Sequence, residues 1–397
     1  MLTAADAEEL CEIGRRAGLD QVGIASAGPF TDVRRALVDR AAAGYASSMQ
    51  FTYRNPERST DPARTLPGVA ALVVGARSYA HAVPDAPPDV PVAARVARYA
   101  AADHYRALRS GLAAMADHLE AGGWAARVVL DDNALVDRAA AHRAGLGWFG
   151  KNANLLVGGL GSWVVLGSVL TDAPLPTDDE PAADGCGSCR RCLDGCPTGA
   201  IVAPGVIDAR RCLAWLVQAE GVFPVQHRVP LGDRLYGCDE CQEVCPPSNR
   251  DVTGARRDAD PTAAPAGPGD WVDVLDLLAA DDDALLDRFG RWYIPRREPR
   301  YLRRNALVVL GNVAPPDHPG VAAAVRAALA DDDPIVRAHA VWAARRLGLD
   351  HLLSAFTGES DPIVRAELDR PEAAVERRTK GVAVALGPTR AAARAGT

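Results

Sequence analysis

Eight of the nine cysteines of this 397-residue chain lie between positions 186 and 245, and their spacing is the first sign of chemistry in the sequence. Thiols gathered this closely can form disulfides, bind zinc, or hold iron–sulfur clusters that carry electrons. The run CGSCRRCLDGCP has the spacing C-x2-C-x2-C-x3-C-P, and further cysteines follow it. The full set is Cys186, Cys189, Cys192, Cys196, Cys212, Cys238, Cys241 and Cys245.

The spacing of the first run is that of bacterial ferredoxins, in which the fourth cysteine binds the other of two clusters. We therefore predict two [4Fe-4S] clusters that together use all eight thiols. Zinc sites also use C-x2-C pairs but rarely the full C-x2-C-x2-C-x3-C-P pattern. Structural disulfides are rare in long cytoplasmic proteins, the class that we expect here. The predicted ligands are Cys186, Cys189, Cys192 and Cys245 for the first cluster, and Cys196, Cys212, Cys238 and Cys241 for the second.

Two adjacent carboxylates lie upstream of the cysteines, in the stretch VVLDDNALVDR. Asp131 and Asp132 stand where a predicted strand ends and a helix begins, a position at which α/β proteins place catalytic groups. A carboxyl there can act as a general acid if burial raises its pKa towards neutrality. The alternative is that one of the two only caps the helix through its first-turn amides. Asp137 and Arg138, one turn further, are candidates for a structural ion pair.

The stretch GLGWFGKN, which ends with Lys151 and Asn152, follows these carboxylates. Its glycines suit close approach of the backbone to a large ligand, although a tight turn is the more common explanation of such a pattern.

The elements that would position these residues follow from periodicity and from turn residues. Residues 3–18 and 102–123 have apolar residues at helical spacing and end at glycines, so we predict helices there. Runs rich in β-branched residues predict strands at 21–26, 69–79, 126–130 and 162–170. The mixture predicts an α+β protein whose N-terminal domain is an α/β layer structure.

The length predicts two or three domains. We place an α/β domain at 1–175, a ferredoxin-like two-cluster domain at 176–250, a linker at 251–270, a helical domain at 271–376 and a disordered tail at 377–397. The sequence DPIVRA occurs at 333–338 and again at 361–366, a period of 28 residues. Proline after an acidic cap, followed by apolar residues, is typical of stacked helical repeats, so the helical domain is predicted to be HEAT-like.

The net charge of −7 argues against a protein that coats nucleic acid through bulk charge, but it leaves room for a local basic patch. The stretch DRFGRWYIPRREPRYLRRN holds seven arginines with four aromatic residues between them. Because arginines neutralise phosphates and aromatic rings stack on bases, we predict an RNA-binding surface; the alternative is a solvated basic helix face. The predicted contacts are Arg296, Arg297, Arg303 and Arg304.

The N-terminus carries acidic residues and no apolar run that would resemble a secretory signal. The longest uncharged run, 152–171, contains four glycines and is better explained by buried strands than by a membrane span. We therefore expect a cytoplasmic protein without a membrane partner. Cys11, on the first predicted helix, is expected to be a buried bystander thiol.

Taken in order, the motifs YRNPERSTDP, LVDRAAAHRAGLGWFGKN, GSWVVLG, CGSCRRCLDGCPTGA and RLYGCDECQEVCP resemble the epoxyqueuosine reductase family over essentially the whole chain. Members of that family remove the epoxide oxygen from epoxyqueuosine in the anticodon loop of tRNA, the last step of queuosine biosynthesis. They use cobalamin and two [4Fe-4S] clusters. The resemblance implies that residues 1–175 bind cobalamin and that the helical domain binds tRNA.

The resemblance also implies roles for individual residues. The family's proposed proton donor is the aspartate of V-D-[ST]-x-P-L-x-[DE]-R, which matches Asp131 of LDDNALVDR; here Asp132 and Ala134 replace the Ser/Thr and the proline, and Asp132 is the alternative donor. No D-x-H-x-x-G motif is present, so the corrinoid is expected to bind base-off. The implied corrinoid contacts are Arg58, Ala97, Asp131, Lys151, Leu155, Ser162, Gln218, Gly237, Asp239 and Glu240.

In the implied scheme, electrons from an unidentified low-potential donor enter the more exposed cluster, pass to the second and reach cobalamin. Asp131 protonates the epoxide oxygen, which leaves as water. We expect a monomer. The alternatives are a reductive dehalogenase-like corrinoid enzyme, which usually carries a twin-arginine export signal not seen here, and a nonenzymatic electron-transfer protein.

Overall fold

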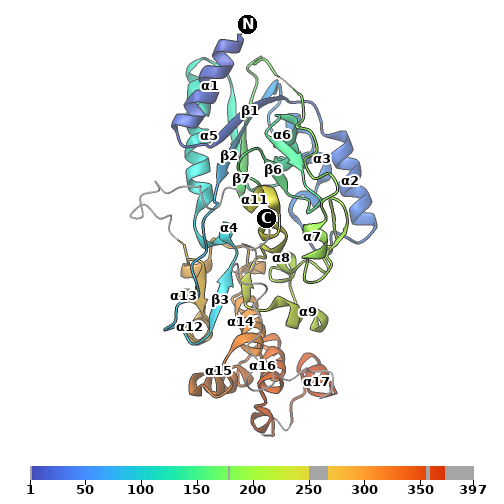
Figure 1. The fold of residues 1–397 in the computed structure, drawn as a ribbon, viewed down its shortest axis with the longest axis vertical. Helices are drawn as coiled ribbons and strands as arrows, with labels where there is room; N and C mark the ends of the chain where they lie inside the picture. Colours follow the sequence, from blue (N-terminus) through green and yellow to red (C-terminus); the bar gives the residue numbers. More distant parts are fainter. Residues whose placement is uncertain (1, 178, 250–266, 355–357, 372–397) are drawn as a thin grey trace, which may run out of the picture. The chain divides into compact units, whose positions relative to one another are not determined.

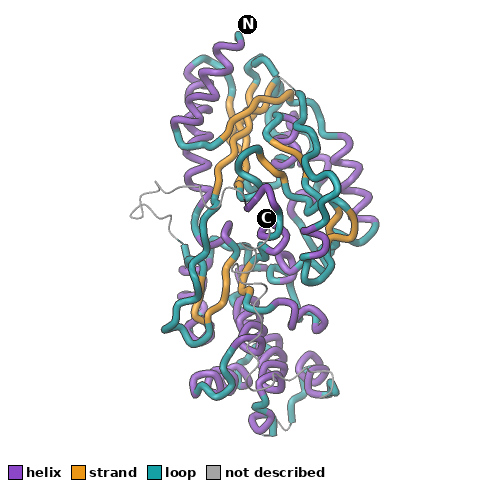
Figure 2. The backbone as a smooth tube through the Cα atoms, viewed as in Figure 1, coloured by secondary structure: helices purple, strands orange, loops and turns teal. Residues whose placement is uncertain are grey.

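The computed structural model describes residues 2–177, 179–249, 267–354 and 358–371 (Figures 1 and 2). Internal contacts divide the chain into two compact units. The first contains the chain up to Val83, Arg98–Trp215 and the segment from Asp239 to Gly267; the second contains Pro84–Ala97, Leu216–Cys238 and the chain from Pro268 onward. The predicted domains are consecutive in sequence, whereas these units interleave. Most of the predicted linker and all of the predicted tail lie outside the described residues.

The first unit is built on an antiparallel sheet with the strand order β1-β2-β7-β4. Its strands are β1 (Gln21–Ser26), β2 (Ala71–Ser78), β7 (Val164–Thr171) and β4 (Ala126–Val129). All four strands were predicted from the sequence, and the structure confirms them to within two residues at each end.

Helices cover both faces of this sheet (Figure 1). The helices α1 (Ala4–Arg16) and α5 (His104–Ala121) pack against one face, and α2 (Thr31–Ala42) and α6 (Asp137–Arg143) belong to the core on the other. Because side chains alternate along a strand, Val73 of β2 points to the first core and Val74 to the second. The two predicted helices are confirmed as α1 and α5.

Glycines in the central strands allow α5 to approach the sheet closely. Gly75 of β2 pairs directly with Gly167 of β7. A Cβ atom at Gly75 would lie 3.1 Å from the side chain of Leu112 on α5, and one at Gly167 would lie 2.7 Å from it. These two positions therefore need glycine for packing and not for chain reversal.

The rest of the first unit consists of short elements that carry the candidate functional residues. An antiparallel hairpin of β5 (Gly147–Phe149) and β6 (Leu155–Val157) follows α6. Residues 51–64 form η1 (Phe51–Tyr53), α3 (Pro56–Ser59) and η2 (Pro62–Arg64), and α4 (Arg98–Ala101) precedes α5. The cysteine region contains α7 (Arg191–Asp194), β8 (Ile201–Ala203), β9 (Val206–Ile207), α8 (Leu213–Leu216), α10 (Glu240–Glu243) and α11 (Pro246–Asn249).

The second unit combines a small sheet with helices. Its sheet has the order β10-β3-β11, from β10 (Arg234–Tyr236), β3 (Ala93–Val96) and β11 (Trp271–Asp273). The helices and turns are α9 (Val225–Leu231), α12 (Val274–Ala279), α13 (Asp282–Phe289), η4 (Pro295–Arg297), α14 (Arg300–Val313), α15 (Pro319–Leu329), α16 (Pro334–Leu347), η5 (Asp350–Leu352) and α17 (Pro362–Leu368).

The internal repeat marks the starts of two of these helices, as predicted. Asp333 caps α16 and Asp361 caps α17, each through a 2.8 Å bond from the backbone amide two residues later, and each helix begins with proline. The structure is therefore an α+β protein with a helical C-terminal region. No helix in the described part of the chain is long and apolar enough to cross a bilayer.

Candidate active site

Asp131 stands two residues beyond the end of β4, at the edge of the first unit's sheet. Its backbone has a φ of +50°, a left-handed conformation that few non-glycine residues adopt, with aspartate among the better tolerated. This turn leaves the side chain accessible to solvent although protein atoms flank it. A carboxyl group held in this way can meet a ligand without first moving the strand that carries it.

The electrostatic surroundings of Asp131 favour its protonated form. Partial burial raises the pKa of Asp131 above its ordinary value, and the neighbouring Asp132 carboxylate raises it further. A hydrogen bond from Tyr105 and the charge of Arg109 act in the opposite direction but do not cancel the rise. The pKa of Asp131 is therefore shifted in the direction that favours proton donation.

Tyr105 is the partner of Asp131 that the sequence did not reveal. It lies in the first turn of α5, where no motif distinguishes it from an ordinary amphipathic helix residue. Burial raises the pKa of Tyr105 far above its ordinary value, and the carboxylates of Asp131 and Asp137 raise it further. Its hydroxyl group therefore keeps its proton and donates to Asp131.

Asp132 has a different function in the loop. Its Oδ1 accepts a 2.6 Å hydrogen bond from the backbone amide of Ala134, which closes a short turn before α6. The alternative in which one of the two aspartates caps the helix is wrong, because the N-cap of α6 is Val136 and Asp132 instead closes the preceding turn. The carbonyl of Ala134 in turn accepts a 3.3 Å bond from the Thr65 hydroxyl.

Asp137, at the start of α6, is a third carboxyl group in the same region. Burial raises the pKa of Asp137 well above its ordinary value, with further increases from the Asp132 and Asp131 carboxylates, and the charge of Arg138 opposes them. The guanidinium of Arg138 donates to the carbonyl of Ala153, 2.8 Å away. The suggested ion pair between Asp137 and Arg138 is therefore at most a weak charge contact.

The structure gathers the thiols predicted to bind the first cluster. Burial raises the pKa of Cys192, and the nearby thiols of Cys245, Cys186 and Cys189 raise it further. Burial also raises the pKa of Cys245, to which Cys186 and Cys189 contribute in the same direction. Cys189 is exposed, whereas Cys245 is buried. Residues from both ends of the cysteine region therefore share one site, as the crossing pattern of the spacing requires.

Two of the thiols predicted for the second cluster, Cys196 and Cys212, also lie near each other. Cys196 accepts a 3.2 Å bond from the amide of Ala200, and Cys212 accepts bonds from the amides of Trp215 and Ala214. Amide bonds to sulfur stabilise thiolates and tune a cluster that they hold. Cys241 belongs to the first unit, and Cys238 is the last residue of a segment of the second.

The donor set fits iron–sulfur clusters better than the two alternatives. All nine cysteines are described and none is in a disulfide; Cys11 is buried on α1 as expected. Among the described residues, no three or more cysteine, histidine or acidic side chains are close enough together to hold a single metal ion. Thiolates of a four-iron cluster each bind a different iron, so they stand farther apart than the ligands of one zinc ion.

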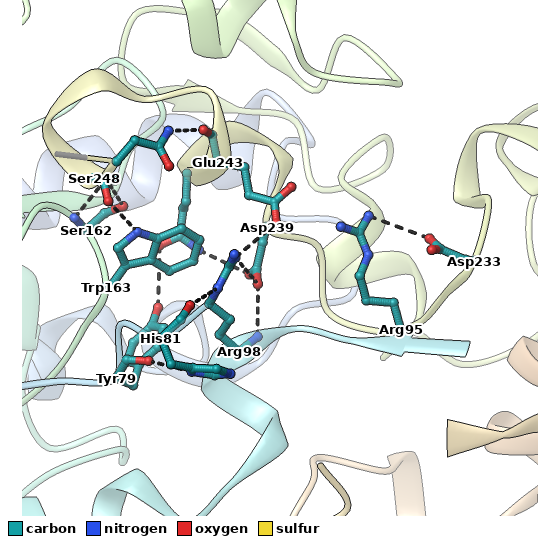
Figure 3. A network of polar contacts seen from close by, with 12 residues as sticks. Tyr79, His81, Arg95, Arg98, Ser162, Trp163, Asp233, Asp239, Glu243 and Ser248 are labelled. Atoms are coloured by element: carbon teal, nitrogen blue, oxygen red, sulfur yellow. Dashed lines mark hydrogen bonds and ion pairs between the residues drawn. The ribbon is translucent and has the colours of Figure 1, made fainter. Parts of the chain in front are cut away.

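A buried network joins the last cysteine segment to the sheet of the first unit (Figure 3). Arg98 is 1% exposed and its guanidinium contacts Asp239 at 3.4 Å and Glu243 at 3.0 Å, while stacking 4.4 Å above the ring of Trp163. Trp163 donates from Nε1 to the carbonyl of Ser248 at 2.8 Å. Figure 3 also shows the hydroxyl groups of Ser162 and Ser248 in contact, 2.9 Å apart.

The positions predicted to contact a corrinoid are therefore engaged in different ways. Asp239 and Ser162 belong to the buried network just described. Leu155 is buried at the start of β6, Arg58 is exposed on α3, and Glu240 begins α10. Ala97, Gln218 and Gly237 belong to the second unit. Six of the ten side chains are charged or carry an amide and four are small or apolar, and groups of the first kind can form hydrogen bonds with the amide side chains of a corrinoid.

Lys151 has partners that the sequence analysis did not foresee. Its ammonium group donates to the carbonyls of Gly187 and Cys189, at 2.6 and 3.0 Å. The amine predicted to contact the corrinoid thus contacts the first cysteine segment.

The arginine-rich segment of the second unit is divided between core and surface. The prediction that Arg304 contacts RNA is wrong, because Arg304 is 1% exposed and donates to the carbonyls of Leu216, Val217, Ala219 and Gly221 over 2.6–3.2 Å. Burial lowers the pKa of Arg304 to about 9. Its guanidinium holds a loop together and cannot reach a phosphate.

The other residues of this segment differ in their exposure. Arg303 pairs with Asp282 at 2.5 Å and is largely covered, whereas Arg296 and Arg297 are exposed, Arg296 in a surface pair with Glu220. Of the four aromatic residues expected to stack on bases, three are buried, namely Phe289, Trp292 and Tyr301, and only Tyr293 is exposed. The exposed part of the segment is therefore Arg288, Arg291, Tyr293, Arg296 and Arg297.

Comparison with known families supports the division of the chain into cluster-binding and repeat regions. Residues 185–248 match a family described as a 4Fe-4S double cluster binding domain, and residues 293–369 match HEAT repeats. The first range contains all eight clustered cysteines, which confirms the prediction of two [4Fe-4S] clusters.

Full-length relatives extend the similarity beyond these regions. The chain is 30% identical to the epoxyqueuosine reductase of Bacillus cereus over 91% of this chain and 96% of the relative. It is 34% identical to that of Xanthomonas campestris over 85% and 95%, respectively.

Solved structures of epoxyqueuosine reductases are also similar to this chain. A crystal structure of epoxyqueuosine reductase with an epoxyqueuosine-modified tRNA-Tyr stem loop is 29% identical, with a TM-score of 0.83 over 93% of this chain and 98% of that one. A structure of the Bacillus subtilis enzyme with its aspartate-bearing catalytic loop swung out of the active site has a TM-score of 0.82 at 29% identity, covering 93% and 99%.

Replacing Arg304 with methionine should destabilise the second unit strongly. The substitution leaves several buried carbonyls without a donor, and each such group costs about 1–3 kcal/mol, so we expect the free energy of unfolding to fall by about 3 kcal/mol or more. Chemical denaturation followed by circular dichroism measures this. Arg296→Met, at an exposed position, is the matched control and should change stability by less than about 1 kcal/mol. Equal stability of the two variants would contradict a structural role for Arg304.

Proposed function

We propose roles for individual residues of this protein. The chain belongs to the epoxyqueuosine reductase family, as its full-length relatives at 30–34% identity show. It is an oxidoreductase that reduces epoxyqueuosine to queuosine at the wobble position of tRNA, the last step of queuosine biosynthesis. Its cofactors are cobalamin and two [4Fe-4S] clusters. The similarity to these enzymes over nearly the full chain favours this reaction over a dehalogenase or a nonenzymatic electron carrier.

Asp131 is the proton donor of this reaction in our proposal. The observation that carries the assignment is the difference between two adjacent exposed carboxylates: Asp132 accepts a bond from the amide of Ala134, whereas Asp131 has a raised pKa and a hydrogen bond from Tyr105. Deoxygenation of an epoxide consumes two electrons and two protons and releases water. Asp131 supplies a proton to the departing oxygen, and Tyr105 orients the carboxyl group through its hydrogen bond.

The bound cobalamin and the clusters supply the two electrons that the reaction consumes. Of this chain's own residues, the two sets of cysteines hold the relay, and the exposed Cys189 marks the first set as the place where an external donor delivers electrons. The donor is an unidentified low-potential reductant. We assign corrinoid contacts to Arg58 and Leu155 in the first unit, and retain Ala97, Gln218, Gly237, Glu240 and Asp239 as further predicted contacts.

The substrate tRNA is bound in part by the exposed arginines of the second unit. Arg296 and Arg297 are consecutive exposed residues of the turn η4, and both have positive φ values. Arg296 pairs only with the exposed Glu220, a contact that a phosphate can replace at small cost. Tyr293 provides an exposed ring nearby in sequence. We further propose that the protein acts as a monomer in the cytoplasm.

Asp131→Asn should abolish turnover while leaving both clusters and cobalamin bound, because the amide cannot release a proton to the substrate. Mass analysis of tRNA after incubation with cobalamin and a low-potential reductant measures loss of one oxygen from the modified base. Asp132→Asn is the matched control and should keep much of the activity, since an amide oxygen can still accept the Ala134 bond. The reverse pattern would move the donor role to Asp132.

Tyr105→Phe should shift the pH dependence of turnover. The Tyr105 hydrogen bond lowers the pKa of Asp131, so its loss raises that pKa further. Because the protonated carboxyl is the active form, activity falls as pH rises through this pKa, and in the variant that fall should occur at higher pH. The measurement is kcat against pH for both proteins. A shift towards lower pH would be inconsistent with a donating hydroxyl.

Replacing both Arg296 and Arg297 with alanine should weaken tRNA binding and reduce the slope of log affinity against log salt by about 2, one for each lost phosphate contact. Arg303→Ala is the control within the same segment, because the Asp282 carboxylate already compensates its charge. Binding curves at several salt concentrations measure both effects. If the double variant binds like the parent protein, the segment is a solvated face with no role in binding.

A further inference from the structure

Two adjacent residues in the turn of the β5–β6 hairpin contact different cysteine segments through their side chains. Lys151 donates to the carbonyls of Gly187 and Cys189, within the predicted first-cluster segment. Asn152, which is 5% exposed, donates from Nδ2 to the carbonyl of Cys241 at 3.2 Å, within the segment predicted to serve the second cluster. A single turn therefore contacts both segments that bind iron–sulfur clusters.

The turn itself is rigid, so these contacts are fixed in space. The amide of Gly150 donates to the carbonyl of Asn154 at 2.8 Å, and the amide of Asn154 donates to the side chain of Asn152 at 3.2 Å. The carbonyl of Lys151 accepts a 2.9 Å bond from the amide of Gly205. Both side chains therefore extend from a backbone that has its own partners.

The same hairpin packs directly against the start of the first cysteine segment. A Cβ atom at Gly185, the residue before Cys186, would lie 2.6 Å from the ring of Trp148 on β5. The hairpin thus touches this segment at Gly185 through Trp148 and at Gly187 and Cys189 through Lys151, one contact on each side of Cys186.

A cation in this position has an electrostatic effect as well as a structural one. Reduction adds one negative charge to a cluster whose thiolates already make it anionic, so a nearby positive charge stabilises the reduced form. A neutral donor such as Asn152 holds its segment without this effect. The two neighbours therefore have separable consequences.

We propose that Lys151 and Asn152 are positioning residues for the two clusters, and that the charge of Lys151 raises the reduction potential of the cluster held by Cys186, Cys189, Cys192 and Cys245. Asn152 fixes the backbone at Cys241 and so retains the other cluster. This inference deepens the proposed function and rests on its assignment of the cysteines.

The test is a redox titration of the full chain loaded with both clusters, monitored by electron paramagnetic resonance without tRNA or cobalamin. In Lys151→Met one of the two midpoint potentials should become more negative, so that at a fixed solution potential the ratio of reduced to oxidised cluster falls about tenfold, or about 59 mV for one electron. Lys151→Arg keeps the charge and should keep the potential.

Arg138→Met is the matched control, because it removes a cation that donates to Ala153 of the same hairpin and contacts no cysteine segment. It should leave both potentials unchanged. If Lys151→Met does not retain its clusters, Lys151→Gln removes the charge but keeps a donor, and its first-cluster potential should fall in the same way. Unchanged potentials in the neutral variants, or an equal shift in Arg138→Met, would overturn the proposal for Lys151.

Asn152→Ala should leave the first potential unchanged and should lose iron from one cluster several times faster than the parent protein in the presence of a chelator. Iron release equal to that of the parent overturns the role of Asn152. Because these readouts involve neither substrate nor corrinoid, they remain informative if Asp131 proves not to be the proton donor.

Discussion

The structure of the first unit depends on the buried guanidinium of Arg98. A charge in this position is costly unless it is paired and hydrogen-bonded. Asp239 and Glu243 supply the pairing, the carbonyl of His81 accepts from Nε at 3.1 Å, and Trp163 covers the group. Some of these partners come from the sheet and others from the end of the cysteine region. The network therefore fixes the end of the cysteine region against the sheet. Cys241 and Cys245 lie within the segment it fixes.

The same principle separates residues that maintain the structure from those left free for chemistry. The buried guanidinium of Arg304 donates to four carbonyls, and the exposed Asp132 accepts from a backbone amide. Asp131 differs from Asp132 because its pKa is raised and its partner is a tyrosine hydroxyl group and not a backbone amide. A carboxyl group with these properties can exchange a proton with a ligand, whereas its neighbour is occupied.

Several residues predicted to contact the corrinoid also have partners within the protein. Lys151, Ser162 and Asp239 were all expected to line the corrinoid, and the structure gives each a partner within the protein. Residues near a cofactor in sequence motifs therefore include many that act on the protein backbone.

The sequence by itself determined the four strands of the main sheet, the helices α1 and α5, the caps of the repeated helices and the grouping of the thiols, because each depends on local periodicity or on fixed ligand spacing. The resemblance of its motifs to those of epoxyqueuosine reductases indicated the reaction and indicated Asp131 as the proton donor. Only the tertiary structure decided that Tyr105 is the partner of Asp131, that Arg304 is structural and that Lys151 contacts the cysteines. These facts depend on contacts such as Lys151 with Cys189 or Arg304 with Leu216, which join residues that are 38 and 88 positions apart. Burial and pairing across such distances follow from packing, which no local pattern encodes.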